Sequence, residues 1–143
     1  MNISSDTVAI LKNFSDINQN ILVKPGNQLQ TISTLKNILA QADVSEKFDQ
    51  EFAIYDLPEF LRAVDLFDKS DLAFNGGQNL TIKDSNSKQA IKYYFADKSV
   101  VVAPTKMIRD DYEVAISSQK ISHFINRNKP IQYWIAIEPD SEF

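Results

Sequence analysis

Cysteine is absent from this chain of 143 residues, and glycine, proline and histidine are scarce. Without cysteine the chain has no disulfide, no thiolate zinc site and no cysteine nucleophile. Its three glycines form no Gly-rich phosphate loop, and Gly76-Gly77 predicts a hairpin turn instead. No apolar run approaches the roughly 18 residues of a membrane helix, and the first residues lack the regions of a secretory signal. We therefore expect a cytoplasmic protein without membrane contact.

The charge balance is acidic, with 15 lysines and arginines against 19 aspartates and glutamates, a net charge of -4. Phosphate neutralisation supplies most non-specific affinity for nucleic acid, so this balance argues against a protein that grips DNA by bulk attraction. It leaves open a protein that surrounds DNA and touches it with a few local cations.

Two segments have the spacing of one-sided amphipathic helices. The first begins near Ser5-Asp6, whose side chains suit a helix N-cap. The second begins at Asp56, with Pro58 in its first turn and Glu59 three residues after the cap. The apolar positions are Thr7, Ile10, Leu11, Phe14 and Ile17 in the first helix, and Leu57, Phe60, Leu61, Val64 and Phe67 in the second.

Each apolar position of the second helix follows its counterpart in the first by 50 residues. The correspondence continues from the turn Pro25-Gly26 to Asn75-Gly76, and each half then carries further alternating, strand-like runs. A strand at 51–55 precedes the second helix, as a short N-terminal segment precedes the first. We therefore predict two βαβββ repeats, at about 1–50 and 51–107, in an α+β fold with both helices on one face of antiparallel sheet.

The pattern changes beyond residue 107. Three strand-like runs, at 112–118, 121–126 and 131–138, follow a polar connector with no helix between them. We expect residues 108–143 to form a C-terminal three-strand tail. Such a tail buries only one face, so it must pack or pair with another element or chain.

Candidates for catalysis are few. His123 is the only histidine and lies between Ile121 and Ile125, where a packing role is the usual one. Neither Ser117 nor Ser118 has an acid–histidine pair at a readable spacing. The acidic pair Asp110-Asp111 reads as ordinary loop charge rather than a metal site. We predict no enzyme, no metal and no cofactor.

Several segments together resemble the DNA sliding clamps of tailed phages of the myovirus type. They are SSDTVAILKNFSDIN, ILVKPG, FAIYDLPEFL and SVVVAP in the first part of the chain, and ISSQKISHF and YWIAIEPDSEF near its end. A subunit of that family carries two such domains, each with two helices, and assembles as a ring around duplex DNA. Here residues 108–112 join the end of the first domain to the last three strands of the second, without the second domain's helices.

The resemblance implies a non-enzymatic processivity factor of phage DNA replication, in the cytoplasm of an infected bacterial cell. Its implied partners are duplex DNA bound without sequence specificity, a DNA polymerase, a clamp loader and further copies of the chain. On the solvent faces of the helices, Lys12 and Asn13 in the first and Arg62 and Lys69 in the second are the candidates for facing DNA. Plain solvated charge is the alternative for these residues, because acidic residues share the same faces.

Two aromatic residues stand apart from the expected core. Tyr94 lies on the opposite strand face from Tyr93, and Trp134 lies on the less apolar face of the last strand. Tyr94, Tyr133, Trp134 and Ile135 are our candidates for a partner or oligomer contact, since aromatic residues are enriched at interfaces. A covering sheet layer is the alternative for Trp134. The competing function is a clamp-fold interaction or structural module that self-associates, or binds a replication protein, without a DNA-encircling ring.

Overall fold

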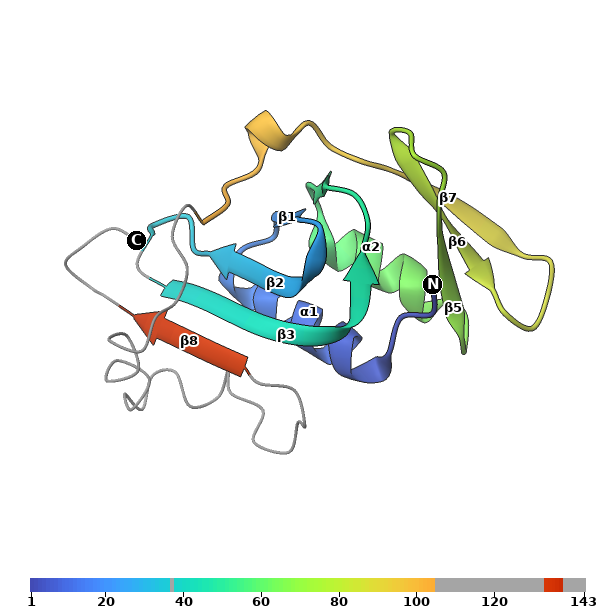
Figure 1. Cartoon of the computed structure of the whole chain (residues 1–143), viewed down its shortest axis with the longest axis horizontal. Coiled ribbons are helices and arrows are strands. Elements are labelled where there is room, and N and C mark those ends of the chain that lie inside the picture. Colours follow the sequence, from blue (N-terminus) through green and yellow to red (C-terminus); the bar gives the residue numbers. More distant parts are fainter. Residues whose placement is uncertain (37, 105–132, 138–143) are drawn as a thin grey trace.

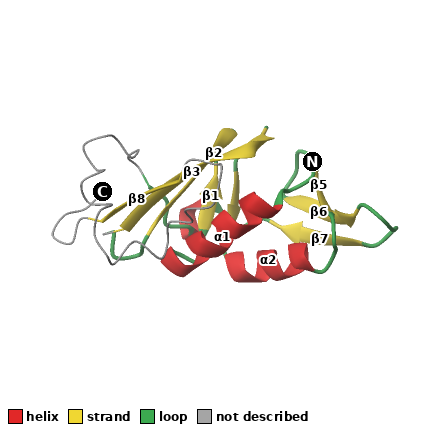
Figure 2. Ribbon diagram, turned by 90° about the horizontal axis from the view of Figure 1, so that it is seen from below, coloured by secondary structure: helices red, strands yellow, loops and turns green. Residues whose placement is uncertain are grey.

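The computed structural model describes residues 1–36, 38–104 and 133–137, and it is an α+β fold with helices and strands in separate layers. Figure 1 shows the order of the elements, and Figure 2 shows α1 and α2 side by side beneath the strands. The first half contains α1 (Ser5–Ile17), β1 (Ile21–Val23), β2 (Gly26–Ile32) and β3 (Ile38–Phe48). The second contains β4 (Phe52–Ile54), α2 (Leu57–Asp65), β5 (Ser70–Phe74), β6 (Asn79–Asp84) and β7 (Ala90–Tyr94). A 3-10 turn at Lys98–Val100 and β8 (Tyr133–Ile137) follow.

Every strand pairing is antiparallel, as predicted, but the described strands form three sheets rather than one. Their orders are β1-β4, β2-β3-β8 and β5-β6-β7. Each half of the chain contributes one strand to the short β1-β4 pair. The predicted two-layer arrangement of helices and antiparallel strands is confirmed, and the strands are divided among three sheets.

The two halves exchange their leading segments. β4, which precedes α2, pairs with β1 of the first half, with Ile21 opposite Ile54. In return, residues 1–3 run along β5 of the second half: the Leu72 N–H donates to the Met1 carbonyl at 2.7 Å, and Asn2 bridges Asp71. The leading strand that we predicted for the first half is thus a single bridge. This exchange ties the two halves together, because the leading segment of each half pairs with a strand of the other half.

The helix limits differ in part from those expected. α1 is capped by Ser4, whose hydroxyl accepts from the Thr7 N–H, one residue before the expected cap. Asp56 caps α2 as predicted, accepting from the Glu59 N–H at 3.1 Å. α2 ends at Asp65, so Phe67 is half-buried beyond the helix rather than on its stripe. The longer of the two helices has 13 residues, and no helix within the described ranges is long and apolar enough to cross a membrane.

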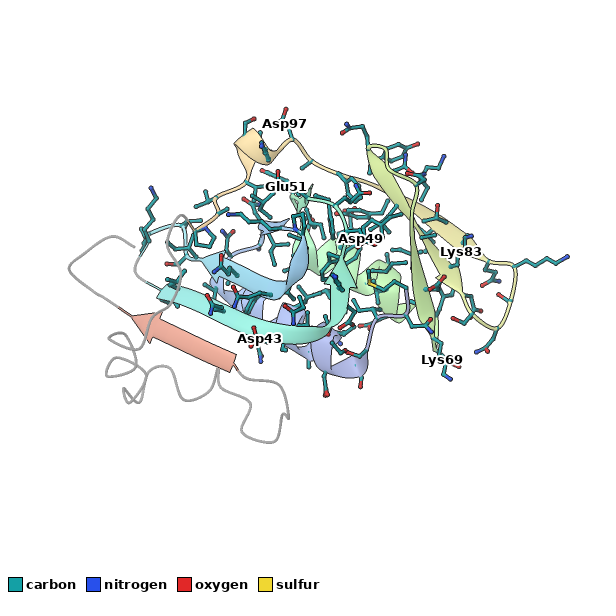
Figure 3. All side chains as sticks on the ribbon, in the orientation of Figure 1. Asp43, Asp49, Glu51, Lys69, Lys83 and Asp97 are labelled. Atoms are coloured by element: carbon teal, nitrogen blue, oxygen red, sulfur yellow. The ribbon has the colours of Figure 1, made fainter. Side chains whose placement is uncertain are left out.

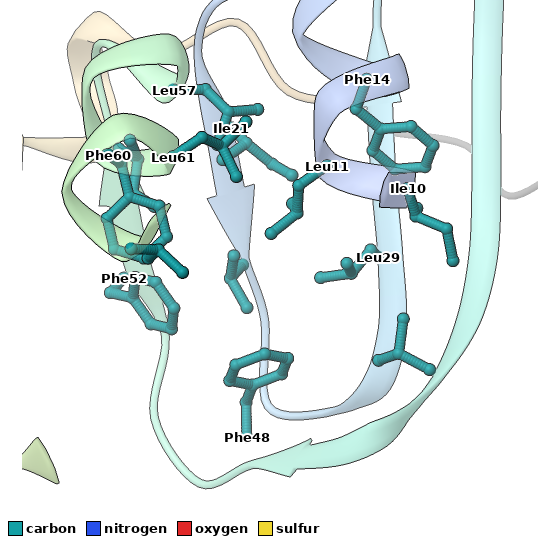
Figure 4. Packing of buried hydrophobic residues seen from close by; sticks show 14 of the residues in the cluster. Ile10, Leu11, Phe14, Ile21, Leu29, Phe48, Phe52, Leu57, Phe60 and Leu61 are labelled. Atoms are coloured by element: carbon teal, nitrogen blue, oxygen red, sulfur yellow. The ribbon is translucent and has the colours of Figure 1, made fainter. Parts of the chain in front are cut away.

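The core lies between the helices and the strands. Figure 4 shows Ile10, Leu11 and Phe14 of α1 meeting Leu57, Phe60 and Leu61 of α2 over apolar side chains from the strands. Burying each such side chain contributes about 1.5–3 kcal/mol relative to leaving it in water. A second cluster of aromatic rings closes the seam between the halves, with centroids 5.0 to 6.5 Å apart; its members are Phe48, Phe52, Phe74 and Phe95.

The predicted tail is described in part. β8 (Tyr133–Ile137) forms within the expected run 131–138 and pairs with β3, with Ile137 opposite Ile38. The expected strands at 112–118 and 121–126, His123, Asp110-Asp111 and the domain boundary after residue 107 lie outside the described residues.

Candidate nucleic-acid interface

The solvent side of α1 and α2, which we call the helical layer, is held together at the helix ends. The Leu57 N–H at the start of α2 donates to the Gln19 carbonyl at 2.8 Å, just past the end of α1. The Asn20 side-chain amide donates to the Tyr55 carbonyl nearby. The end of α1 therefore meets the start of α2. These bonds also satisfy backbone groups that helix termini leave without partners.

The other end of α1 is fixed by a buried carboxylate on β3. Glu46 is 5% exposed, and its side chain accepts from the Ser4 N–H at 2.7 Å and from the Thr7 hydroxyl at 2.6 Å. Burial opposes ionisation, but the hydrogen bonds from Thr7, Ser4 and Ser45 outweigh it and hold the pKa of Glu46 below its ordinary value. In a capping box, a glutamate of the helix itself accepts a hydrogen bond from the backbone N–H of the N-cap residue. Here Glu46, which lies on β3, accepts that hydrogen bond from Ser4.

One predicted DNA-facing residue is already paired. The Lys12 Nζ lies 3.1 Å from Asp65 Oδ2, so an ion pair joins α1 to the last residue of α2. Arg62 is exposed, and within the described part of the chain it has no ion pair. The helices together carry more acidic than basic side chains; the charged residues are Asp6, Lys12, Asp16, Glu59, Arg62 and Asp65. Any contact of this layer with phosphate is therefore weak.

The remaining two DNA-facing candidates, Asn13 and Lys69, differ in their burial and in their position relative to the helices. Asn13 is half-buried on α1, next to Lys12. Lys69 is exposed but follows the end of α2, so its expected place on the helix was wrong. Figure 3 shows Lys69, which lies just before the start of β5, and Lys83, which lies on β6 of the same sheet as β5. The structure therefore brings Lys12 and Arg62 onto one layer and leaves Lys69 outside both helices.

The predicted contact residue Tyr94 is 65% exposed at the end of β7. β7 pairs with β6 on one side, and among the described strands nothing pairs with its other side. Lys92 lies two residues before Tyr94 on the same strand face, and Lys83 lies on that face of β6. The other contact candidates, Tyr133, Trp134 and Ile135, lie on β8 in register with Ala42, Gln41 and Ala40.

A groove with a volume of about 290 Å³ lies on the helical layer, where α1 passes the end of α2. Lys12 and Asp65 line it, together with apolar side chains that include Val8 and Phe67. In the described ranges, no three histidine, aspartate or glutamate side chains are grouped so that they would hold a metal ion. What the described residues offer on the helical layer is weak electrostatic contact over a helical surface.

Two structurally important residues were not identified from the sequence. Asn18 is buried after α1 and donates to the carbonyls of Ile32 and Val102, which ties the segment after the 3-10 turn to the first half. Glu46 continues the inward-facing alternation of Ile38, Ala40, Ala42 and Val44, and this spacing was the available signal. No short-range pattern pairs Asp65 with Lys12, because the two residues lie on different helices.

Comparison with known proteins places these features in a family. Residues 4–103 match the DNA polymerase processivity factor family. The sliding clamp of Enterobacteria phage T4 is 37% identical over 108 residues, that of Escherichia phage RB69 36% over 110 and that of Vibrio phage KVP40 35% over 107. The matches cover 75–76% of this chain and 47–48% of the relatives. The chain thus spans about half the length of the curated relatives it matches.

Two solved structures share the fold at low sequence identity. PCNA from Thermococcus kodakaraensis superposes with a TM-score of 0.57 at 15% identity, covering 77% of this chain and 50% of that one. The DNA polymerase III subunit beta of Borrelia burgdorferi gives 0.51 at 17% identity, covering 78% and 34%. The predicted clamp-like α+β fold is confirmed.

Proposed function

This chain belongs to the DNA polymerase processivity factor family, and we propose that it acts as a clamp-type processivity factor in phage DNA replication. In this function the helical layer lies along duplex DNA and contacts phosphate without reading sequence. The chain performs no chemistry of its own. Its proposed partners are duplex DNA, a DNA polymerase and a clamp loader.

The observation that carries this proposal is the joining of α1 and α2 into one layer. The exchange of leading segments and the bond from Leu57 to Gln19 set both helices on the same side of the strands. A surface that moves along DNA needs few and weak phosphate contacts, because each strong contact would have to break at every step. The excess of acidic over basic residues on the two helices supports such a role.

Self-association belongs to the same proposal. β7 is an edge strand within the described part of the fold, and Tyr94 is exposed on it. Unpaired strand edges and exposed aromatic side chains both favour protein–protein contact.

The second candidate is a clamp-fold interaction module without a ring. The pairing of Lys12 with Asp65 favours it, since this ion pair reduces the attraction of the helical layer to DNA. In this case the chain would form a small oligomer or bind a replication protein through its strand edges. Removing charge from the helical layer would then leave its partner binding unchanged.

The test is duplex binding by fluorescence anisotropy at several salt concentrations, combined with light scattering for the oligomer. We expect Lys12→Gln with Arg62→Gln to weaken binding and to reduce its salt dependence. The matched control removes two lysines from the exposed face of the β5-β6-β7 sheet, Lys83→Gln with Lys92→Gln. Loss of binding in the control alone would place DNA on that sheet face and overturn the proposed role of the helical layer. A monomer or dimer without DNA binding would favour the interaction module.

A further inference from the structure

We infer that Asp65 limits how strongly this chain holds DNA, because it neutralises Lys12 and leaves Arg62 as the cation of the helical layer that meets phosphate. The inference rests on the proposed function. It concerns a residue that contributes no positive charge and makes no proposed contact with DNA itself. Its role is to set the number of phosphate contacts that the layer makes.

The first observation is the geometry of the pair. Lys12 Nζ and Asp65 Oδ2 are 3.1 Å apart, and the two side chains remain 54% and 50% exposed. A pair so open to water contributes little to folding, since solvent screens it and both side chains lose freedom. Asp65 is moreover the last residue of α2, where a carboxylate meets the negative end of the helix dipole. Stability of the helix therefore does not explain the aspartate.

The second observation is an asymmetry between the repeats. Lys12 and Arg62 are equivalent under the spacing of 50, and the same spacing makes Asp65 equivalent to Ser15. Ser15 is neutral, and its hydroxyl donates to the Lys12 carbonyl within α1. At this one repeat position, therefore, the second half carries a carboxylate, which pairs with Lys12, and the first half carries a neutral hydroxyl. The two cations, equivalent in sequence, are not equivalent in charge environment.

The consequence for DNA follows from electrostatics. A lysine paired at 3.1 Å presents a dipole to a distant phosphate, and a dipole attracts an anion less than a single charge does. The logarithm of the binding constant falls linearly with the logarithm of the salt concentration. Each phosphate that a cation neutralises adds about 0.9 to the magnitude of this slope, which is the quantity meant by the slope below. Removing the carboxylate should make Lys12 available and raise the slope by about that amount. Between 50 and 200 mM salt, one added contact makes the loss of affinity roughly three- to fourfold larger.

The experiment measures this slope for full-length chains on a fluorescent duplex of mixed sequence. Asp65→Asn is expected to steepen it, whereas Asp16→Asn, which removes the same charge from the last turn of α1, is expected to leave it unchanged. Ser15→Asp is expected to lower the slope by about one by masking Arg62, with Ser15→Ala as its control. The double variant Asp65→Asn with Ser15→Asp keeps the natural net charge and is expected to restore the natural slope.

The outcomes separate this inference from the function on which it rests. If Asp65→Asn and Asp16→Asn shift binding equally, Asp65 acts only through net charge and the inference is wrong. If the natural chain shows no salt-dependent duplex binding and Arg62→Gln changes nothing, the proposed function itself fails. Circular dichroism and urea unfolding of each variant check the fold, and a slope is compared only between variants of natural stability. A natural slope in the double variant supports the inference that a carboxylate beside a cation masks it from phosphate. If either substitution had acted by damaging the fold, adding the other substitution would not restore the slope.

Discussion

Thr7 donates its hydroxyl hydrogen to Glu46 Oε1 at 2.6 Å, joining the first turn of α1 to β3 across 39 residues of sequence. The same carboxylate accepts from the Ser4 N–H, so a single buried side chain fixes the start of the helix that carries Lys12. The position of the helical layer against the sheet therefore depends on a residue far from its surface.

Replacing Glu46 tests this anchor. Glu46→Gln keeps the size of the side chain but removes its charge, and hydrogen bonds to a charged group are worth about 1.5–3 kcal/mol. We expect a loss of about 1–3 kcal/mol in the free energy of unfolding, measured by urea denaturation. Glu51→Gln, at an exposed ion pair with Lys98, is the control and should cost under about 1 kcal/mol. Equal losses in the two variants would contradict the anchor.

The pH dependence of stability provides a second test of Glu46. Its pKa in the folded chain lies below the ordinary value of 4.5, so the unfolded chain binds the proton more readily. The contribution of Glu46 is therefore complete above about pH 4.5 and is lost as the pH falls through the lowered folded pKa. In urea titrations between pH 6 and pH 3, natural stability should fall more steeply than that of Glu46→Gln. Parallel curves would show that Glu46 has no shifted pKa.

Tyr93 should ionise well above the ordinary pKa of a tyrosine. Burial raises its pKa to about 12, and the nearby carboxylates of Glu59 and Asp56 add to the shift. Because the folded pKa lies above the ordinary value of 10.0, stability should decrease as the pH rises from about 10 to about 12. Absorbance at 295 nm would follow the ionisation, and Tyr93→Phe should remove a component that titrates near pH 12. The idea is refuted if the variant titrates like the natural chain.

The cap of α2 depends on a side-chain oxygen at Asp56. Asp56→Ala removes the acceptor for the Glu59 N–H and should cost about 1 kcal/mol, because an orphan donor remains at the helix start. Asp56→Asn retains an acceptor and should stay close to natural stability. Chemical denaturation of the two variants distinguishes them. A similar loss in both would mean that the charge of Asp56, rather than its cap, stabilises the helix.

Local patterns determined the parts of this fold that depend on neighbours a few positions apart. The stripes from Ile10 to Phe14 and from Phe60 to Val64, the Asp56 cap and the strand around Ile91 and Tyr93 all formed as predicted. Helix periodicity, capping and strand alternation are set by residues within one or two turns or pleats. The spacing of 50 also follows from sequence alone, since it needs only comparison of the chain with itself.

Contacts between distant elements were decided only by the tertiary structure. The pairing of β4 with β1, the anchoring of α1 by Glu46 and the neutralisation of Lys12 by Asp65 each join residues far apart in the sequence, as Ile21 and Ile54 are in β1 and β4. The repeat gives Lys12 and Arg62 the same local sequence position, but their charge environments depend on which side chain the opposite helix presents. Amphipathic spacing states which face of a helix is buried, and it leaves open what that face meets. Which element packs against each buried helix face depends on the packing of the whole chain.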